Sequence, residues 1–232
     1  MPKKTDMPPS AIGHPVRTDE SRPGLRANAL RRTRHSRDIP HAVSSSCSKA
    51  GELALQLLLD PHVTSVEFLT SLSFSGREVP VEMFVAELDD GSRVSFDIID
   101  ERAYRDLDAD GLLLLTLKSH SICIIEIDRA SIDSQPRANN TCRLWSYRDH
   151  QVPVQLRAAI DRALASGRRL TIRSLANIIG LHDPIPTIGA LVSQGVLAID
   201  LSRPLRPHSL VGRRSDRWPV ARRPGWFGKD GQ

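Results

Sequence analysis

The 232-residue sequence predicts a mixed α/β fold, an α/β sandwich followed by a small helical module. Two observations carry this prediction. Residues 46–150 place apolar residues first at helical spacing and then in the alternation of strands. Residues 151–211 contain three short helical patterns that each end near a glycine. The length allows one large domain or two small ones, each with its own core.

Local patterns predict the elements of the α/β part. The first expected helix begins after Ser44-Ser45-Ser46, one of which can cap it, and ends at Asp60-Pro61. The later turn Asp89-Asp90-Gly91 contains the Asp-Gly pair typical of a two-residue hairpin turn. The other expected elements are a strand at 63–69, hairpin strands at 79–88 and 92–99, a helix at 102–117, a buried strand at 121–127 and a short helix at 136–147.

The helical module at 151–211 is expected to contain three short helices. The first ends at Gly167, Thr171 can cap the second, and Pro184 opens the third. A strand at 196–201 follows. Three short helices and a strand are the parts of a winged helix.

Charge is distributed unevenly along the chain. Residues 1–48 carry 9 basic and 4 acidic side chains, residues 49–150 carry 10 and 18, and residues 151–232 carry 13 and 5. One interpretation is a metal-using acidic core held on nucleic acid by its basic flanks. The other is that the arginine-rich ends, expected to be disordered at 1–45 and 212–232, are only solvated tails. Three arginines of the first end could contact phosphates: Arg31, Arg32 and Arg34.

Several classes of protein are disfavoured. No apolar run approaches the roughly 20 residues of a membrane helix, and the first residues do not form a signal peptide. The three cysteines, Cys47, Cys123 and Cys142, are widely spaced and odd in number, which favours neither a disulfide framework nor a zinc ribbon. Phosphate-binding glycine loops and serine-hydrolase motifs are not found. We therefore expect a cytoplasmic protein without a membrane partner.

A set of short motifs occurs in an order that points to one family. Between Ser46 and Val211 the sequence resembles the TnsA-like endonuclease subunits of heteromeric transposases. The resemblance implies a restriction-endonuclease-like α/β/α core at 46–150 and a winged-helix-like domain at 151–211. It also implies DNA, a transposase catalytic subunit and an ATP-dependent regulator as partners. The motifs are Glu52, Leu59-Asp60-Pro61-His62-Val63, the hairpin, 132–139, Val152-Pro153, Pro204-Leu205 and Ser209-Leu210-Val211.

The family's chemistry is metal-dependent hydrolysis of a phosphodiester. Such a site needs carboxylates that converge on Mg²⁺ and a lysine near the attacking water. By resemblance, the catalytic carboxylates are Glu52, Glu82 and Asp97, and Glu82 and Asp97 are the expected metal ligands. A two-residue turn at Asp90-Gly91 would make Glu82 and Asp97 diagonal neighbours on one face of the hairpin.

The family's lysine is missing, because Ile99 stands in its place. Loss of such a cation costs about 10²–10³-fold in rate. Lys118 is the only nearby candidate for a displaced catalytic lysine, while Arg102 could supply charge but cannot accept a proton from water; we expect loss of the cation rather than its replacement. We therefore expect a degenerate nuclease that acts in DNA-end binding or transposase assembly, with Mg²⁺ required only if cleavage survives. The alternatives are an active Mg²⁺-dependent endonuclease and a DNA-binding regulator without a role in transposition. The three carboxylates could also be ordinary surface acids.

The helical module is not expected to read base sequence. Its third helix offers only Thr187, Ser193 and Gln194 to base edges. The start of its second helix carries Arg168, Arg169 and Arg173, which suit phosphate contacts. The pattern indicates a docking module with nonspecific affinity for DNA.

Overall fold

The computed structural model describes residues 48–216 and residue 218. The expected N-terminal segment at 1–45, including Arg31, Arg32 and Arg34, lies outside the described residues, as do the serines expected to cap the first helix. Ser48 fills the capping position instead, and its side chain accepts a hydrogen bond from the Gly51 N–H. The helices in this range are all too short or too polar to cross a membrane.

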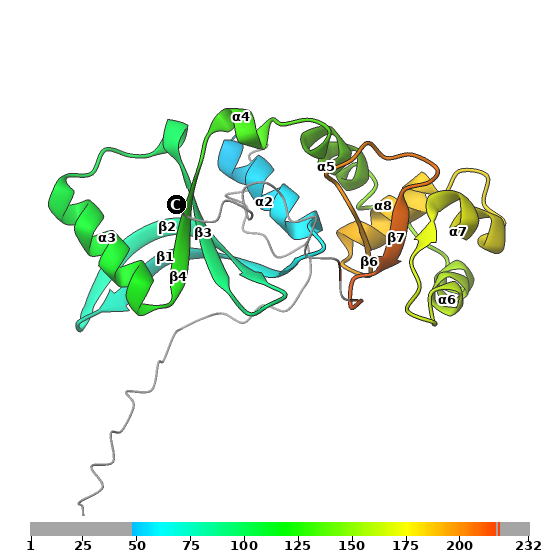
Figure 1. The fold of residues 1–232 in the computed structure, drawn as a ribbon, viewed down its shortest axis with the longest axis horizontal. Coiled ribbons are helices and arrows are strands. Elements are labelled where there is room, and N and C mark those ends of the chain that lie inside the picture. Colours follow the sequence, from blue (N-terminus) through cyan, green and yellow to red (C-terminus); the bar gives the residue numbers. More distant parts are fainter. Residues whose placement is uncertain (1–47, 217, 219–232) are drawn as a thin grey trace, which may run out of the picture. The chain divides into compact units, whose positions relative to one another are not determined.

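A four-stranded mixed sheet forms the first part of the structure (Figure 1). Its order is β1-β2-β3-β4, in which the first three strands are antiparallel and β4 runs parallel to β3. The elements are α2 (Lys49–Leu59), β1 (Val63–Phe74), β2 (Arg77–Leu88), β3 (Arg93–Ile98), η2 (Ile99–Glu101), α3 (Leu107–Ser119), β4 (Ile122–Ile127), α4 (Arg129–Ile132) and α5 (Arg137–Trp145).

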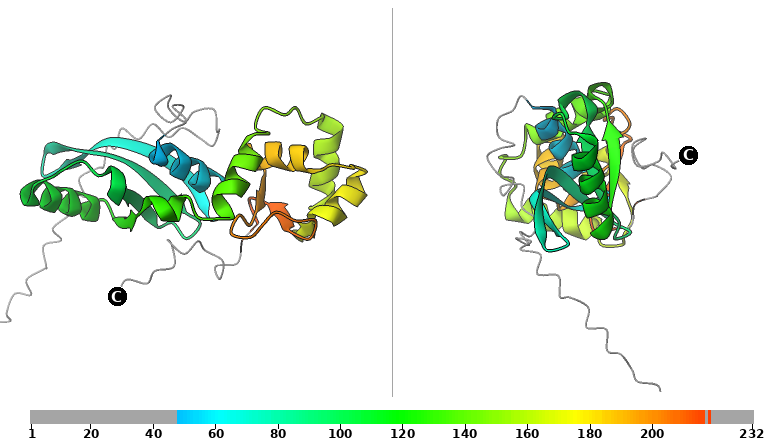
Figure 2. Two further views of the ribbon diagram at one scale, coloured as in Figure 1. Left: turned by 90° about the horizontal axis from the view of Figure 1, so that it is seen from above. Right: turned by 90° about the vertical axis from the view of Figure 1, so that its left-hand side faces the viewer.

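Helices cover both faces of this sheet, as the left view of Figure 2 shows for α2 and α3. Leu53 and Leu57 of α2 pack with Phe96 and other residues of one face. Leu113 and Leu117 of α3 pack with residues of the other face, including Val85. The predicted mixed α/β sandwich is confirmed. The helix expected at 102–117 begins later, at Leu107, because the Asp106 carboxylate accepts a hydrogen bond from the Ala109 N–H and caps it there.

The hairpin differs from the predicted one in its turn. Val85 pairs with Ser95, and the Leu88 N–H donates to the Ser92 carbonyl at 2.8 Å, which leaves three residues, 89–91, in the turn. Gly91 has a φ of 81°, a conformation that favours glycine. The predicted two-residue turn is therefore wrong by one residue, and a shift of one residue moves every side chain of a strand to the other face.

The second part contains three helices and a small sheet of order β5-β7-β6. Thr171 caps α7 through the Ser174 N–H, as predicted, and Gly180 ends it in the left-handed conformation. Gly212 and Arg213 belong to β7, so the predicted start of the disordered tail at residue 212 is wrong. Residues 217 and 219–232 lie outside the described residues. The elements are α6 (Val154–Ala163), β5 (Leu170–Thr171), α7 (Ile172–Ile179), α8 (Ile185–Ser193), β6 (Leu197–Ile199) and β7 (Leu210–Arg213).

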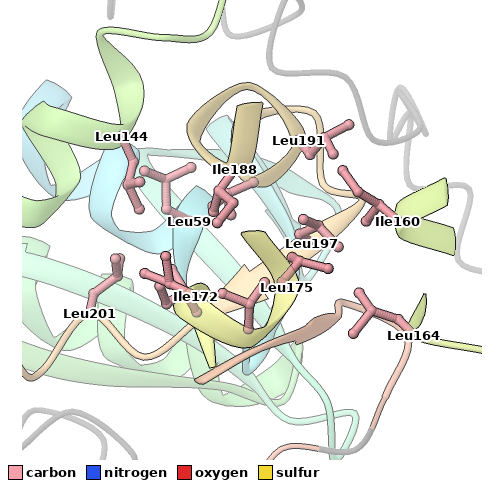
Figure 3. Packing of buried hydrophobic residues seen from close by; sticks show 13 residues of the cluster. Leu59, Leu144, Ile160, Leu164, Ile172, Leu175, Ile188, Leu191, Leu197 and Leu201 are labelled. Carbon is pink, nitrogen blue, oxygen red and sulfur yellow. The ribbon is translucent and has the colours of Figure 1, made fainter. Parts of the chain in front are cut away.

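One hydrophobic cluster crosses the expected domain boundary near residue 150. Leu59 of α2 and Leu144 of α5 pack with Ile188 and other buried residues of the second part (Figure 3). Within 48–216, this cluster joins the two expected domains through a common core.

Candidate functional site

Glu52 lies in the first turn of α2 and belongs to an ion-pair network. Lys49 Nζ lies 2.8 Å from Glu52 Oε2 and 2.6 Å from Asp133 Oδ1. Asp133 is the residue that follows α4. Hydrogen bonds to Asp133 and then to Glu52 raise the pKa of the Lys49 ammonium. The network ties the start of α2 to the end of α4.

Glu82 sits in an irregular part of β2. Leu69 pairs with Met83 but Ser71 pairs with Pro80, so an extra residue is accommodated there as a β-bulge. Glu82 has a φ of 43° and an exposed side chain, whereas its neighbours Val81 and Met83 are buried. The β2–β3 pairs end at Val85–Ser95, before this point is reached. The predicted placement of Glu82 as a diagonal neighbour of Asp97 is therefore wrong.

Asp97 lies on β3 beside Glu126 of β4, and both contact one arginine. Arg102 Nη2 is 2.7 Å from Asp97 Oδ2 and 2.5 Å from Glu126 Oε1. Hydrogen bonds to Glu126 and then to Asp97 raise the pKa of the Arg102 guanidinium. A second arginine, Arg105, approaches Asp97 to 4.0 Å. The Asp97 side chain is only 8% exposed, so its negative charge needs a positive partner. The guanidinium groups of Arg102 and Arg105 supply that positive charge in place of a metal ion.

Lys118, the candidate for the missing catalytic lysine, lies away from Asp97. It is exposed near the C-terminal end of α3, just before β4 begins. The first residue of β4, Ile122, pairs with Arg93 at the start of β3, while Asp97 is near the opposite end of that strand. Lys118 and Asp97 thus lie at opposite ends of the β3–α3–β4 unit.

The three predicted carboxylates, all within the described residues, do not belong to one group of metal-ligand side chains. Among residues 48–216 and 218, no three His, Cys, Asp or Glu side chains form a group that could hold a metal ion, and Glu52, Glu82 and Asp97 are all in this range. Ile99 follows β3 in a 3-10 turn and is 51% exposed. The residues present do not fit Mg²⁺, since the most buried carboxylate of the predicted set is already engaged by Arg102.

Helix α8 occupies the third-helix position but is buried along most of its length. Seven consecutive residues, 187–193, are buried, and α8 packs against α5. A Cβ placed on Gly189 would lie 3.0 Å from the Leu144 carbonyl oxygen and from Tyr147 Cβ. Two of the three polar residues predicted for this helix, Thr187 and Ser193, are therefore inaccessible to a DNA groove.

A basic pocket of about 400 Å³ lies beside the loop that joins β6 to β7. Its charged lining includes Arg169, Arg203 and Arg206 as well as Asp200. Two histidines, His62 and His208, also line it, and a smaller adjacent pocket is lined by His208 and Arg173. We call Arg169, Arg173, Arg203, Arg206 and His208 the wing face.

Hydrogen bonds hold the loop that carries the wing face. The Arg173 N–H donates to the Pro207 carbonyl at 2.8 Å, and Asn140 Nδ2 of α5 donates to the Arg203 carbonyl at 2.7 Å. The Arg169 guanidinium lies 4.7 Å from the centre of the Trp218 ring, a cation–π contact. These contacts place cationic side chains from separate segments around one hollow.

The structure thus brings together only part of the predicted basic set. Arg169 and Arg173 belong to the wing face, and Arg168 is exposed next to Arg169. Sequence reasoning missed Arg203 and Arg206, because they follow the last strand expected in the module, at 196–201, where no further element was predicted. The apolar residues Leu210 and Val211 downstream could have indicated that the chain returns to the core.

Comparison of the sequence with protein-family models and with curated proteins gives no match.

Proposed function

We propose that this chain is a TnsA-like DNA-transposition protein that binds duplex DNA through the wing face and does not cut it. The observation that carries the proposal is the clustering of four arginines and one histidine around adjoining pockets, from the residue before β5, from α7 and from the β6–β7 loop. Cationic groups from several segments on one face are the usual footprint of a phosphate-backbone interface.

The order of elements supports the proposed ancestry. A helix, three antiparallel strands, a crossover helix and a fourth strand parallel to the third form an α/β/α core, as expected for a restriction-endonuclease-like domain. Helices α6, α7 and α8 with a β5-β7-β6 sheet are the elements expected for a winged helix. Both expectations come from the resemblance, and the mixed α/β topology supports the proposal.

The contacts of Arg102 support a role without cleavage. A nuclease centre leaves its carboxylates open to a metal ion and places a lysine beside the attacking water. Here Arg102 bridges Asp97 and Glu126, Glu82 lies outside their strand pairing, and Lys118 is at the other end of β3. In this proposal the domain positions DNA and its transposase partners, the catalytic subunit and the ATP-dependent regulator.

The accessible basic groups favour binding that is nonspecific in sequence. Arginine guanidinium groups donate paired hydrogen bonds to phosphate oxygens, which are the same at every base pair. The helix that would read the major groove is α8, and its buried residues cannot contact base edges. The affinity should therefore depend strongly on salt and little on base composition.

A salt titration of DNA binding tests the interface. We expect Arg203→Ala/Arg206→Ala in the full chain to weaken binding to a duplex and to lower the slope of log affinity against log salt concentration by about 2, since two phosphate contacts are lost. The matched control, Arg77→Ala/Arg129→Ala, removes the same charge from exposed positions on the first part of the structure and should leave the slope unchanged. Equal effects of the two variants would refute the wing face as the interface.

A cleavage assay tests the second half of the proposal. The full chain is assembled with the complete transposase and its end DNA in Mg²⁺ or Mn²⁺. We expect wild type and Asp97→Asn to give the same pattern of cut strands and to support assembly equally. Loss of a specific strand cut in Asp97→Asn, with DNA binding intact, would show an active nuclease. Failure of the chain to associate with the transposase would favour a regulator without a role in transposition.

A further inference from the structure

Helix α3 carries leucines that the described part of the chain leaves exposed. Leu107 is 91% exposed, Leu114 is 51% and Leu115 is 55%. The helix is held on the sheet by its other side, through Leu113, Leu117 and the buried Thr116. Four leucines occur in succession at 112–115, and only one of them is needed for packing against the sheet.

The exposed leucines form one stripe at helical spacing. Leu107, Gly111, Leu114 and Lys118 follow one another at intervals of three or four residues, and Leu115 lies four residues after Gly111, so these residues share the face opposite the buried side chains. Gly111 lies in the middle of this stripe, and a Cβ built on it meets nothing within 4 Å. The fold of one chain therefore does not require a glycine there, whereas close approach of a second helix would benefit from it.

We propose that this stripe, the α3 face, packs against the α3 face of a second copy of the same chain, with the two helices antiparallel about a two-fold axis. Burial of apolar side chains on both copies supplies the driving force. An isologous contact requires a surface that is complementary to itself.

The charges on α3 provide that complementarity. Asp106, Asp108 and Asp110 lie at its N-terminal end, and Lys118 lies at its C-terminal end. In an antiparallel pair the acidic end of each helix lies beside the basic end of the other, and Asp108 faces Lys118 of the second copy. A parallel pair would place like charges together, so the charge pattern selects the antiparallel arrangement of two copies.

The oligomeric state of the full chain tests the contact. In sedimentation equilibrium we expect the wild type to form dimers and Leu114→Glu to weaken the dimer by about a hundredfold, because two copies each lose a buried leucine and bury a carboxylate. Ile178→Glu is the matched control, since Ile178 is 61% exposed on α7 and should leave the dimer intact. Unchanged thermal unfolding of dilute samples shows that the variants fold.

Charge reversal distinguishes this arrangement from a nonspecific apolar contact. Asp108→Lys and Lys118→Asp should each weaken the dimer by about tenfold, since each creates two like-charge contacts, and the double variant should restore it. A wild type that stays monomeric at high concentration overturns the proposal, whatever else covers the face. So does a dimer that is insensitive to Leu114→Glu, or a double variant that is no better than the single ones. None of these outcomes bears on DNA binding by the wing face.

Discussion

Loss of the Asp60 carboxylate should strongly weaken the fold. It ends α2, its side chain is fully buried, and its Oδ2 accepts hydrogen bonds at 3.0 Å from both Nη1 and Nη2 of Arg137. Its Oδ1 accepts from the His62 N–H at 2.8 Å. Arg137 begins α5, so this pair fastens the helix that packs on α8 to the end of α2. The Arg214 guanidinium contacts the same turn, at the carbonyls of Leu58 and Asp60.

The expected loss follows from burial on both sides of the pair. The Arg137 side chain is 8% exposed and that of Asp60 is 0% exposed, so removal of one charge leaves the other in a poorly solvated place. Breaking such a buried pair costs about 3–5 kcal/mol. Asp60→Asn keeps the size of the side chain and the acceptor for the His62 N–H, so most of its effect reports the missing charge.

Equilibrium denaturation of the full chain in urea measures this loss. We expect Asp60→Asn and Arg137→Met each to lower the free energy of unfolding by about 3–5 kcal/mol, and the double variant to lower it by clearly less than the sum. The shortfall is the coupling energy of the pair. A loss below about 1 kcal/mol for Asp60→Asn, or strict additivity in the double variant, would refute the argument that this ion pair fastens α5 to α2.

Four further substitutions test local features by the same measurement. Gly189→Ala should destabilise the protein by about 1–3 kcal/mol, because the new Cβ meets α5, whereas Gly111→Ala in dilute solution should stabilise it by about 0.5–1 kcal/mol through helix propensity. The test is that the two substitutions change the free energy of unfolding in opposite directions. Thr171→Ala should cost about 1 kcal/mol by removal of the α7 cap. Stability due to Lys49 should persist at neutral pH and disappear as the pH rises beyond 10.5, since its pKa is raised, and Lys49→Met should abolish that alkaline loss.

Local signals in the sequence were sufficient for the elements whose ends are fixed locally. The cap at Thr171 and the left-handed glycine at Gly180 confirm the predicted second helix of the module. The stop at Asp60-Pro61 agrees with the observed end of α2 at Leu59. In these places the hydrogen bonds at the end of the helix come from adjacent residues, so the local sequence is sufficient to predict where the helix begins or ends.

The hairpin shows where local reasoning fails. The Asp-Gly pair fits both a two-residue and a three-residue turn, and the difference of one residue decides which side chains face each other. The bulge at Glu82 adds a second irregularity in the same strand. The predicted carboxylate pair depended on both points, and neither has an unambiguous local signature.

The contacts of Arg102 and the residues of the wing face could not be predicted from the sequence for a different reason. Arg102 reaches Asp97 and Glu126 on two parallel strands that the α3 crossover separates in the chain. The wing face combines residues near 170 with residues near 205, and the sheet of β5, β7 and β6 brings them together. Such sites depend on tertiary pairing, and charge counts along the sequence report only that basic residues are abundant.

Helix α8 explains why the winged-helix pattern should not be equated with sequence-specific DNA reading. A helix that reads a groove needs one polar, accessible face, but Ile188, Ala190, Leu191 and Val192 are buried on successive sides of α8. One side packs in the module's own core and the other against α5. A helix that is buried on these sides has no face left for base edges, so in the proposed function the contact with DNA is assigned to the wing face instead. The fold alone does not determine which of its helices meets the nucleic acid.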